Sequence, residues 1–308
     1  MKTLLITAIG GDIAQSVATI IRESRPELCL IGVDMNQRHA GAFFVDHFSL
    51  VPAASDVTYF DVLLKIMDAF DVDALLPISE QELALFVHEE NVLAGRPVIH
   101  CGKSVLKAGL DKLSTFRELE RQGIAVPWTF PVVSDKPKNF PCIMKPRTGS
   151  GSKFIFLIEN EYDHAYYSKK YKDSIYQELL LPADQEITCA VYRTLDGRIT
   201  VIQFLRELVG GLTGWAQVIN NIEIHEVCYQ IAETLNLRGS MNVQLRLTEK
   251  GPRIFEINPR FSSTVLMRHK LGFSDVLWVI DEIENKYIDF PEIKTGSIVA
   301  RVQSAIVI

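Results

Sequence analysis

Short apolar runs alternate, over the first hundred residues, with segments in which apolar residues recur every three or four positions. The runs TLLITAI and LCLIGVDM have the length and composition of buried strands, and IAQSVATIIRES between them has helical spacing. Such a βαβ unit implies parallel strands, because the helix crosses over the sheet. The pattern continues through HFSLVP, a helix near 57–70, ALLPI, a helix over 79–95 and PVIHC. Residues 1–101 are therefore predicted to form a Rossmann-like open α/β domain.

The pattern changes after residue 101. A helix KLSTFRELERQG is followed by proline-rich connections, the strands CIMKP, KFIFLI and SIYQELL, and a charged helix near 160–171. These elements predict a linker helix and a small α+β lobe over 102–182. Over 183–308, the strands EITCAVYR, ITVIQFLREL, SMNVQLRLT and PRIFEIN accompany the helix EIHEVCYQIAETLN, which predicts a larger antiparallel lobe.

The stretch IFEINPRFSST places polar residues at every second position of an otherwise apolar strand. Glu256, Asn258 and Arg260 therefore point to one side. A turn at EKG brings this strand back along MNVQLRLT, so Gln244 is expected beside Glu256. Oxygen-bearing side chains of this kind suit Mg²⁺ bridging nucleotide phosphates, with Arg260 neutralising phosphate charge. The alternative, a polar strand face exposed to water, fits less well because Phe255 and Phe261 flank these positions.

A glycine-rich segment follows the strand CIMKP. Lys145 ends that strand, and the segment after it carries the small and hydroxyl residues Thr148, Gly149, Ser150, Gly151 and Ser152. Backbone N–H groups of such a loop can converge on phosphate oxygens, and a lysine adds a positive charge. The lysine precedes the glycines, so this is not a Walker A loop. A plain β-hairpin turn is the alternative interpretation.

The segment YQELLLPADQEIT joins the small lobe to the large one. Free backbone groups at Gln177, Glu178 and Leu179 could meet an adenine edge, and the carboxylate of Glu186 could hold ribose hydroxyls. On its own this segment also fits an exposed strand end with solvated acidic residues.

Composition excludes several classes of protein. The chain has 308 residues, 47% of them hydrophobic, and a formal net charge of −6, which argues against nucleic-acid binding. We find no apolar run long enough to span a membrane. The 5 cysteines are widely spaced and have no metal-ligand pattern, which indicates reduced thiols in a cytoplasmic protein.

The segment NVQLRLTEKGPRIFEINPRFSST resembles the metal-binding strands of ATP-grasp enzymes, especially the synthetase domains of the carbamoyl-phosphate synthetase large subunit and their free-standing relatives. The resemblance extends over most of residues 1–280, through LDK, MKPRTGSGS and YQELL in the same order. It implies an ATP-grasp fold with an N-terminal Rossmann-like pre-ATP-grasp domain. The chain ends near residue 308 without a second synthetase half, so carbamoyl phosphate is not the expected product.

The resemblance also implies site residues. Lys112 and Lys145 match the two ATP-binding lysines, 148–153 the loop over the phosphates, 177–179 the adenine contact and Glu186 the ribose contact. The implied metal ligands are Gln244, Glu256 and Asn258, with Mg²⁺ or Mn²⁺ as the metal, and the implied phosphate-facing cations are Arg206 and Arg260. One departure concerns RELVGGLTGWAQV, which is shorter and more apolar than the charged pattern expected there and puts the role of Arg206 in question.

The predicted function is an ATP-dependent ligase that phosphorylates a small-molecule carboxylate to an acylphosphate, which an amine then attacks. Substrate contacts are expected from the turn GGDIAQ, the loop PISEQE and the segment 262–268, where Ser262 and Thr264 could instead cap a helix. The expected partners are the small-molecule substrates and a second copy of the chain in a homodimer. The alternatives are an NAD(P)-dependent oxidoreductase, suggested by the spacing of Tyr166 and Lys170, and a non-catalytic nucleotide-binding module.

Overall fold

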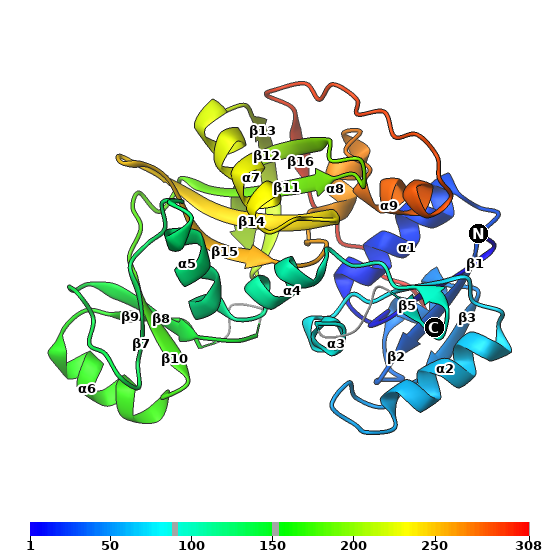
Figure 1. The fold of residues 1–308 in the computed structure, drawn as a ribbon, viewed down its shortest axis with the longest axis horizontal. Coiled ribbons are helices and arrows are strands. Elements are labelled where there is room, and N and C mark those ends of the chain that lie inside the picture. The colour runs from blue at the N-terminus through cyan, green and yellow to red at the C-terminus, as the bar shows by residue number, and fades with distance from the viewer. Residues whose placement is uncertain (88–91, 150–153, 308) are drawn as a thin grey trace.

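A computed structural model describes residues 1–87, 92–149 and 154–307 of the chain. The described elements form a parallel α/β unit, a small antiparallel lobe that projects at the opposite end, and a large antiparallel sheet between them (Figure 1). This arrangement agrees with the predicted α/β and α+β fold.

The N-terminal unit is a parallel sheet with the strand order β3-β2-β1-β4. Its elements are β1 (Thr3–Ile6), α1 (Asp12–Ser24), β2 (Cys29–Asp34), the 3₁₀ helix η1 (Ala40–Phe44), β3 (His47–Leu50), α2 (Tyr59–Ala69), β4 (Ala74–Leu76), α3 (Glu80–Leu85), β5 (Val92–Leu93) and β6 (Arg96–Pro97). The predicted open α/β arrangement is confirmed.

The helix predicted over 79–95 is wrong over 92–95, and residues 88–91 lie outside the described part of the chain. Ser79 caps α3 as a capping box with Glu82, but the helix ends at Leu85. Residues 92–97 instead form the β5–β6 hairpin, whose turn residues Ala94 and Gly95 have positive φ angles of 49° and 82°. Left-handed backbone of this kind is incompatible with continuing a helix.

The linker consists of α4 (Lys103–Gly109) and α5 (Lys112–Arg121). The small lobe contains β7 (Thr129–Pro131), β8 (Cys142–Pro146), β9 (Phe156–Ile158), α6 (Glu161–Lys170) and β10 (Ser174–Glu178), with the strand order β7-β10-β8-β9. Its core is separate from the rest of the molecule and is built from Val132, Cys142, Met144, Ile158 and Tyr176.

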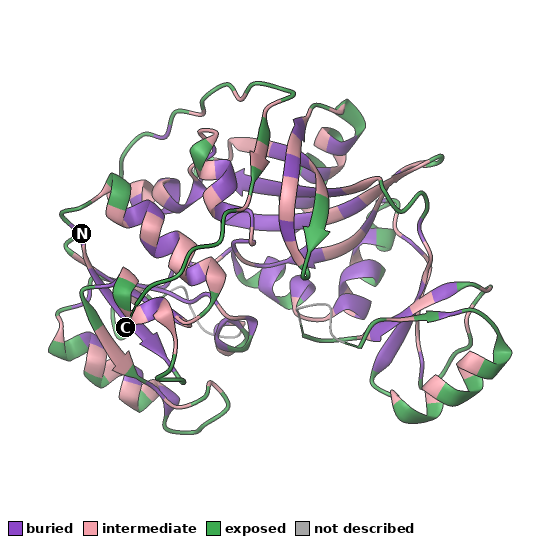
Figure 2. Ribbon diagram, turned by 180° about the vertical axis from the view of Figure 1, so that it is seen from behind, coloured by how far each residue is buried: buried purple, intermediate pink, exposed green. Residues whose placement is uncertain are grey.

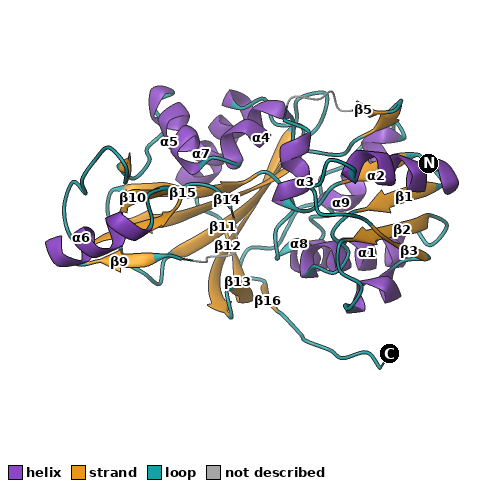
Figure 3. Ribbon diagram, turned by 90° about the horizontal axis from the view of Figure 1, so that it is seen from below, coloured by secondary structure: helices purple, strands orange, loops and turns teal. Residues whose placement is uncertain are grey.

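The large lobe is a six-stranded sheet with the order β15-β14-β11-β12-β13-β16. Its elements are β11 (Glu186–Arg193), β12 (Ile199–Val209), β13 (Leu212–Ile219), α7 (Ile222–Thr234), β14 (Gly239–Thr248), β15 (Gly251–Asn258), α8 (Val265–Lys270), α9 (Asp275–Ile283) and β16 (Ile298–Ala300). Helices α4, α5 and α7 cover one face of this sheet, while α8 and α1 lie toward the other (Figure 3). The sequence did not predict β13 or β16.

The two faces of this sheet follow from strand alternation. In β14, Met241, Val243 and Leu245 are buried in the core beneath α7, whereas Gln244 and Arg246 lie on the opposite face and are only partly buried. The central strands are mostly buried, and the end of β12 is exposed (Figure 2). The same hydrophobic clusters continue into the N-terminal sheet, so this unit and the large lobe share their core.

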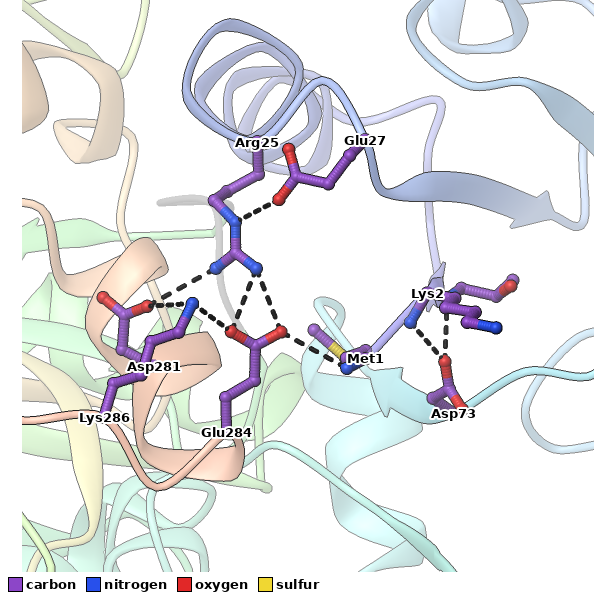
Figure 4. A network of polar contacts seen from close by, with 9 residues as sticks. Met1, Lys2, Arg25, Glu27, Asp73, Asp281, Glu284 and Lys286 are labelled. Atoms are coloured by element: carbon purple, nitrogen blue, oxygen red, sulfur yellow. Dashed lines mark hydrogen bonds and ion pairs between the residues drawn. The ribbon is translucent and has the colours of Figure 1, made fainter.

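Ion pairs also join the N-terminal unit to α9 (Figure 4). Arg25 donates to both carboxylate oxygens of Glu284 at 2.9 Å and reaches Asp281 at 3.4 Å. The α-amino group of Met1 lies 3.3 Å from Glu284 as well. Hydrogen bonding from Arg25 lowers the pKa of Glu284 to about 2. None of the described helices is long and apolar enough to cross a lipid bilayer.

Candidate active site

A cavity of about 520 Å³ lies where the linker and the small lobe meet the polar face of the large sheet. Residues of all three parts of the molecule line it, including Ile13 of α1. The structure brings ten of the predicted site residues to this cavity: Lys112, Lys145, Thr148, Gly149, Glu186, Arg206, Gln244, Glu256, Asn258 and Arg260. Three others, Ser150, Gly151 and Ser152, lie outside the described residues.

The three predicted metal ligands lie on adjacent strands. Gln244 pairs with Glu256 across β14 and β15, and Asn258 is two positions further along. A register shift next to this pair leaves Phe255 without a partner, as in a β-bulge. Because of this extra residue, Ile254 and Ile257 both reach the core although they are three positions apart, while Glu256 and Asn258 line the cavity.

Each of these three side chains has a cation beside its oxygen. Arg206 donates to Gln244 Oε1 at 3.0 Å, Arg260 donates to Asn258 Oδ1 at 3.3 Å, and Lys112 Nζ lies 3.6 Å from Glu256 Oε1. A divalent cation with phosphate oxygens fits this donor set, since Mg²⁺ is usually held by one or two carboxylates plus substrate phosphates. The described residues form no cluster of three or more His, Cys, Asp or Glu, so they offer no cage made of those side chains alone.

The two predicted lysines approach the cavity from different elements. Lys145 of β8 donates to the carbonyl oxygen of Phe255 at 2.8 Å, and Lys112 of α5 donates to that of Gly149 at 2.6 Å. Burial lowers the pKa of Lys145 to about 8; the carboxylate of Glu256 opposes this shift, and the charge of Lys112 adds to it. Anionic phosphate would favour the charged form of Lys145.

Glu186 is held between two guanidinium groups. Arg206 and Arg246 each donate to one of its carboxylate oxygens at 2.8 Å. Arg246 also donates to the carbonyl oxygen of Leu180, at the connection between the lobes, at 2.8 Å. A polar chain therefore runs from this connection through Glu186 and Arg206 to Gln244. The ribose contact of Glu186 stays a prediction. The sequence did not predict that Arg246 would hold this carboxylate.

The predicted adenine contact does not line this cavity in the described part of the chain. Gln177 is buried and donates to the hydroxyl of Thr129 at 3.1 Å, and the carboxylate of Glu178 accepts from the backbone N–H of Trp128 at 3.3 Å. Leu179 directly follows the end of β10. Both polar side chains are thus used within the small lobe, and the N–H of Glu178 already donates to the carbonyl oxygen of Trp128 at 3.0 Å. Only backbone groups of 177–179 that the sheet does not use are candidates for base recognition.

The N-terminal unit contributes an ion pair that sequence spacing could not reveal. Glu80 at the start of α3, within the predicted PISEQE loop, lies 3.0 Å from Arg260 and is buried. Ser262 and Ser263 line the cavity as well. Arg268 does not reach it, because its guanidinium is fully buried against Asp275.

Comparison with known proteins places these features in a family. The ATP-grasp domain family matches residues 110–264, about half of the chain, and the family described as the PylC-like N-terminal domain matches residues 4–98. An uncharacterized protein of Methanocaldococcus jannaschii is 24% identical over 205 residues, which cover 62% of this chain and 50% of that protein. The chain thus spans about half the length of the curated relative it matches.

Solved structures share the fold at low sequence identity. An N5-carboxyaminoimidazole ribonucleotide synthetase in complex with ADP has a TM-score of 0.76 and 18% identity, covering 96% of this chain and 80% of the synthetase. An L-amino acid ligase from Bacillus licheniformis has a TM-score of 0.73 and 15% identity, covering 92% and 74%. With the matching domain family and the ordered site residues, these observations lead to one conclusion: the chain belongs to the ATP-grasp family.

Proposed function

We propose that this protein is an ATP-dependent ligase that joins a small-molecule carboxylate to an amine and releases ADP and phosphate. The observation that carries the proposal is the cavity itself, in which the oxygens of Gln244, Glu256 and Asn258 lie among four cationic side chains. Such a set suits the transfer of a highly charged phosphoryl group, which depends on positioning and charge neutralisation rather than on a protein nucleophile. The family and the similar ligase structures support it.

In the first step, an oxygen of the substrate carboxylate attacks the γ-phosphorus of ATP, and the bond to the β-phosphate oxygen breaks. A divalent metal, Mg²⁺ or Mn²⁺, would neutralise phosphate charge when held by Gln244, Glu256 and Asn258. Lys112 and Lys145 would attract the phosphates, and Arg206 and Arg260 would offset the charge that develops during transfer.

In the second step, the amine attacks the acyl carbon of the acylphosphate. Inorganic phosphate leaves and the amine loses a proton, so an amide forms. The chain's contribution is to hold the acylphosphate and the amine together and to exclude water, which is worth roughly 7–11 kcal/mol in favourable cases. Glu80 positions Arg260 from the N-terminal unit, so this step is proposed to occur where that unit meets the metal strands.

The remaining assignments are part of the same proposal. We assign 1–101 as a pre-ATP-grasp domain, 102–182 as linker and small lobe, and 183–308 as the large lobe. The backbone of 177–179 would meet adenine, the segment 148–153 would cover the phosphates, and Glu186 would lie near the ribose. A cytoplasmic location and a homodimer remain predictions.

Trapping with hydroxylamine tests the proposal without knowledge of the natural amine. Hydroxylamine converts an acylphosphate to a stable hydroxamate, so purified protein with ATP, Mg²⁺ and a panel of carboxylic acids should form hydroxamate and ADP in equal amounts. Omitting the acid or chelating the metal should stop both products.

The variants Glu256→Gln and Glu249→Gln form a matched pair, because both glutamates lie on the β14–β15 hairpin but Glu249 is exposed in its turn. Only Glu256→Gln should lose hydroxamate formation. Release of ADP without any hydroxamate, for every acid tested, would contradict the ligase proposal and favour phosphoryl transfer to another acceptor. Hydride transfer with NAD(P)H would instead support the alternative function of an oxidoreductase.

A further inference from the structure

One wall of the cavity is apolar, although the rest of its lining is rich in charge. It is formed by the β12–β13 hairpin, from which Leu208, Gly211 and Leu212 line the cavity beyond Arg206. The side chain of Leu208 is 44% exposed. This wall belongs to the segment RELVGGLTGWAQV, which is shorter and more apolar than the charged pattern expected at this point of an ATP-grasp enzyme.

The hairpin is anchored close to its turn. Thr213 is fully buried; its hydroxyl accepts a hydrogen bond from Arg206 at 3.3 Å, and its carbonyl oxygen accepts one from Arg301 at 3.0 Å. The turn uses Gly210 and Gly211 with φ angles of 61° and 82°, which suits a tight two-residue hairpin turn. The leucines are therefore presented by a fixed strand pair.

Further apolar side chains complete the rim. Ile13 of α1 lines the same cavity from the N-terminal unit. Phe154 and Ile155 line it from the small lobe and are 60% and 46% exposed. Large apolar side chains exposed together at the mouth of a cavity are typical of a ligand-binding groove rather than of ordinary protein surface.

The position of this wall identifies the part of the ligand that meets it. Nucleotide phosphates and metal would occupy the charged region at β14 and β15, which carries Glu256. Leu208 and Leu212 belong to β12 and β13, on the other side of β11 in the sheet, and Leu208 is two residues beyond Arg206 along β12. The side chains that the hairpin adds to the cavity beyond Arg206 carry neither charge nor hydrogen-bonding groups. A sugar or a phosphorylated substrate would lose its hydration there without gaining partners.

We propose that the carboxylate substrate carries an apolar body, aliphatic or aromatic, that packs against Leu208 and Leu212 while its carboxylate faces Arg206 and Arg260. This inference rests on the proposed ligase function and deepens it, because it names the substrate class. One substrate molecule could reach both regions, because the same cavity contains the metal-ligand oxygens and the apolar wall.

Two homologous series of acids test the inference in the hydroxylamine assay. One series runs from acetate to octanoate, and the other consists of α-amino acids from glycine to norleucine, in case an ammonium group is required. In at least one series, kcat/KM should rise with chain length by roughly fourfold per methylene until the wall is covered, the value expected for burying one CH₂ group. The variant Leu208→Ser/Leu212→Ser should flatten this dependence to less than twofold.

Val209→Ser is the matched control, because Val209 lies on the same hairpin, is 69% exposed and is not among the described residues lining the cavity. It should keep the wild-type dependence. Rates independent of chain length, or a preference for short hydroxylated or phosphorylated acids, would overturn the inference while leaving the ligase function intact. The inference would also be overturned if Leu208→Ser/Leu212→Ser changed the KM for ATP but kept the wild-type dependence on chain length. The leucines would then contribute to nucleotide binding, through closure of the small lobe, and not to binding of the acid. Absence of hydroxamate from every acid would contradict the ligase function itself.

Discussion

Two clusters of charge involve residues of the segment that follows β15, and they differ in how completely their hydrogen bonds are satisfied. In the closed cluster, Arg268 donates to both oxygens of Asp275, at 2.9 and 2.6 Å, and to the hydroxyls of Ser262 and Thr264. Arg268 and Asp275 have exposures of 0% and 1%. No part of either charge is available to a ligand.

The open cluster consists of Lys112, Glu256 and Arg260, which line the cavity and whose contacts with oppositely charged groups are 3.0 Å or longer. Lys112 lies 3.6 Å from Glu256, and Arg260 divides its donors between Glu80, Asn258 and a backbone oxygen. These groups keep capacity for additional partners. The comparison indicates that the closed cluster fixes the chain, whereas the open one is arranged for a ligand that supplies the missing charge.

Breaking the closed cluster should have the largest effect on stability. Asp275→Ala leaves the guanidinium of Arg268 buried without a counter-charge, so the free energy of unfolding should fall by about 3–5 kcal/mol, measured by urea denaturation. The double variant Arg268→Met/Asp275→Leu removes both charges and should lose less than the single variant. A single variant as stable as the wild type would show that the pair is not structural.

Breaking the open cluster should affect activity instead. Glu256→Ala should lower Mg²⁺-dependent ADP release at least about 100-fold, because it removes the only carboxylate among the proposed metal ligands. Its urea midpoint should change little, since Glu256 is only partly buried and its partner Lys112 keeps the bond to Gly149. If Glu256→Ala lost as much stability as activity, the open cluster would be structural in the same way as the closed one.

The smallest effect should be a pH dependence of nucleotide affinity. With a pKa of about 8, Lys145 is charged at pH 7 and mostly neutral at pH 9. The Kd for ADP without turnover should therefore rise by about tenfold between these values if binding requires the charged lysine. In Lys145→Ala the Kd should be higher and nearly independent of pH over this range. A flat profile in the wild type would mean that Lys145 keeps its proton or does not meet phosphate.

The sequence predicted the fold well where periodicity is strong and local. The parallel N-terminal sheet, α5, α7 and the pairing of β14 with β15 agree with the predictions. The predicted helix over 79–95 was wrong because its composition is helical but its backbone turns at Ala94 and Gly95. Strands β13 and β16 were missed; β13 contains glycine, and β16 has only three residues at the sheet edge.

The candidate site could be predicted only where its residues share one strand or one strand pair. Gln244, Glu256 and Asn258 meet because of a hairpin register that the alternation already indicated. The contact between Glu80 and Arg260 spans 180 positions and depends on packing of the N-terminal unit against the large lobe. The hydrogen bond from Arg246 to the carbonyl oxygen of Leu180 also depends on packing between lobes. No local sequence pattern indicates which backbone carbonyl a distant arginine will contact.

The bulge at Phe255 lets β15 carry one residue more than its partner strand without moving the carboxylate. Glu256 pairs with Gln244, and paired residues of adjacent antiparallel strands lie on the same face, so a strand without Phe255 would still place Glu256 there in regular alternation after Ile254. What the extra residue adds is an aromatic ring 5.8 Å from Lys145 Nζ and the carbonyl oxygen to which that lysine donates. The inserted residue therefore serves the neighbouring lysine, while the register of the hairpin alone fixes the side of the sheet that bears the carboxylate.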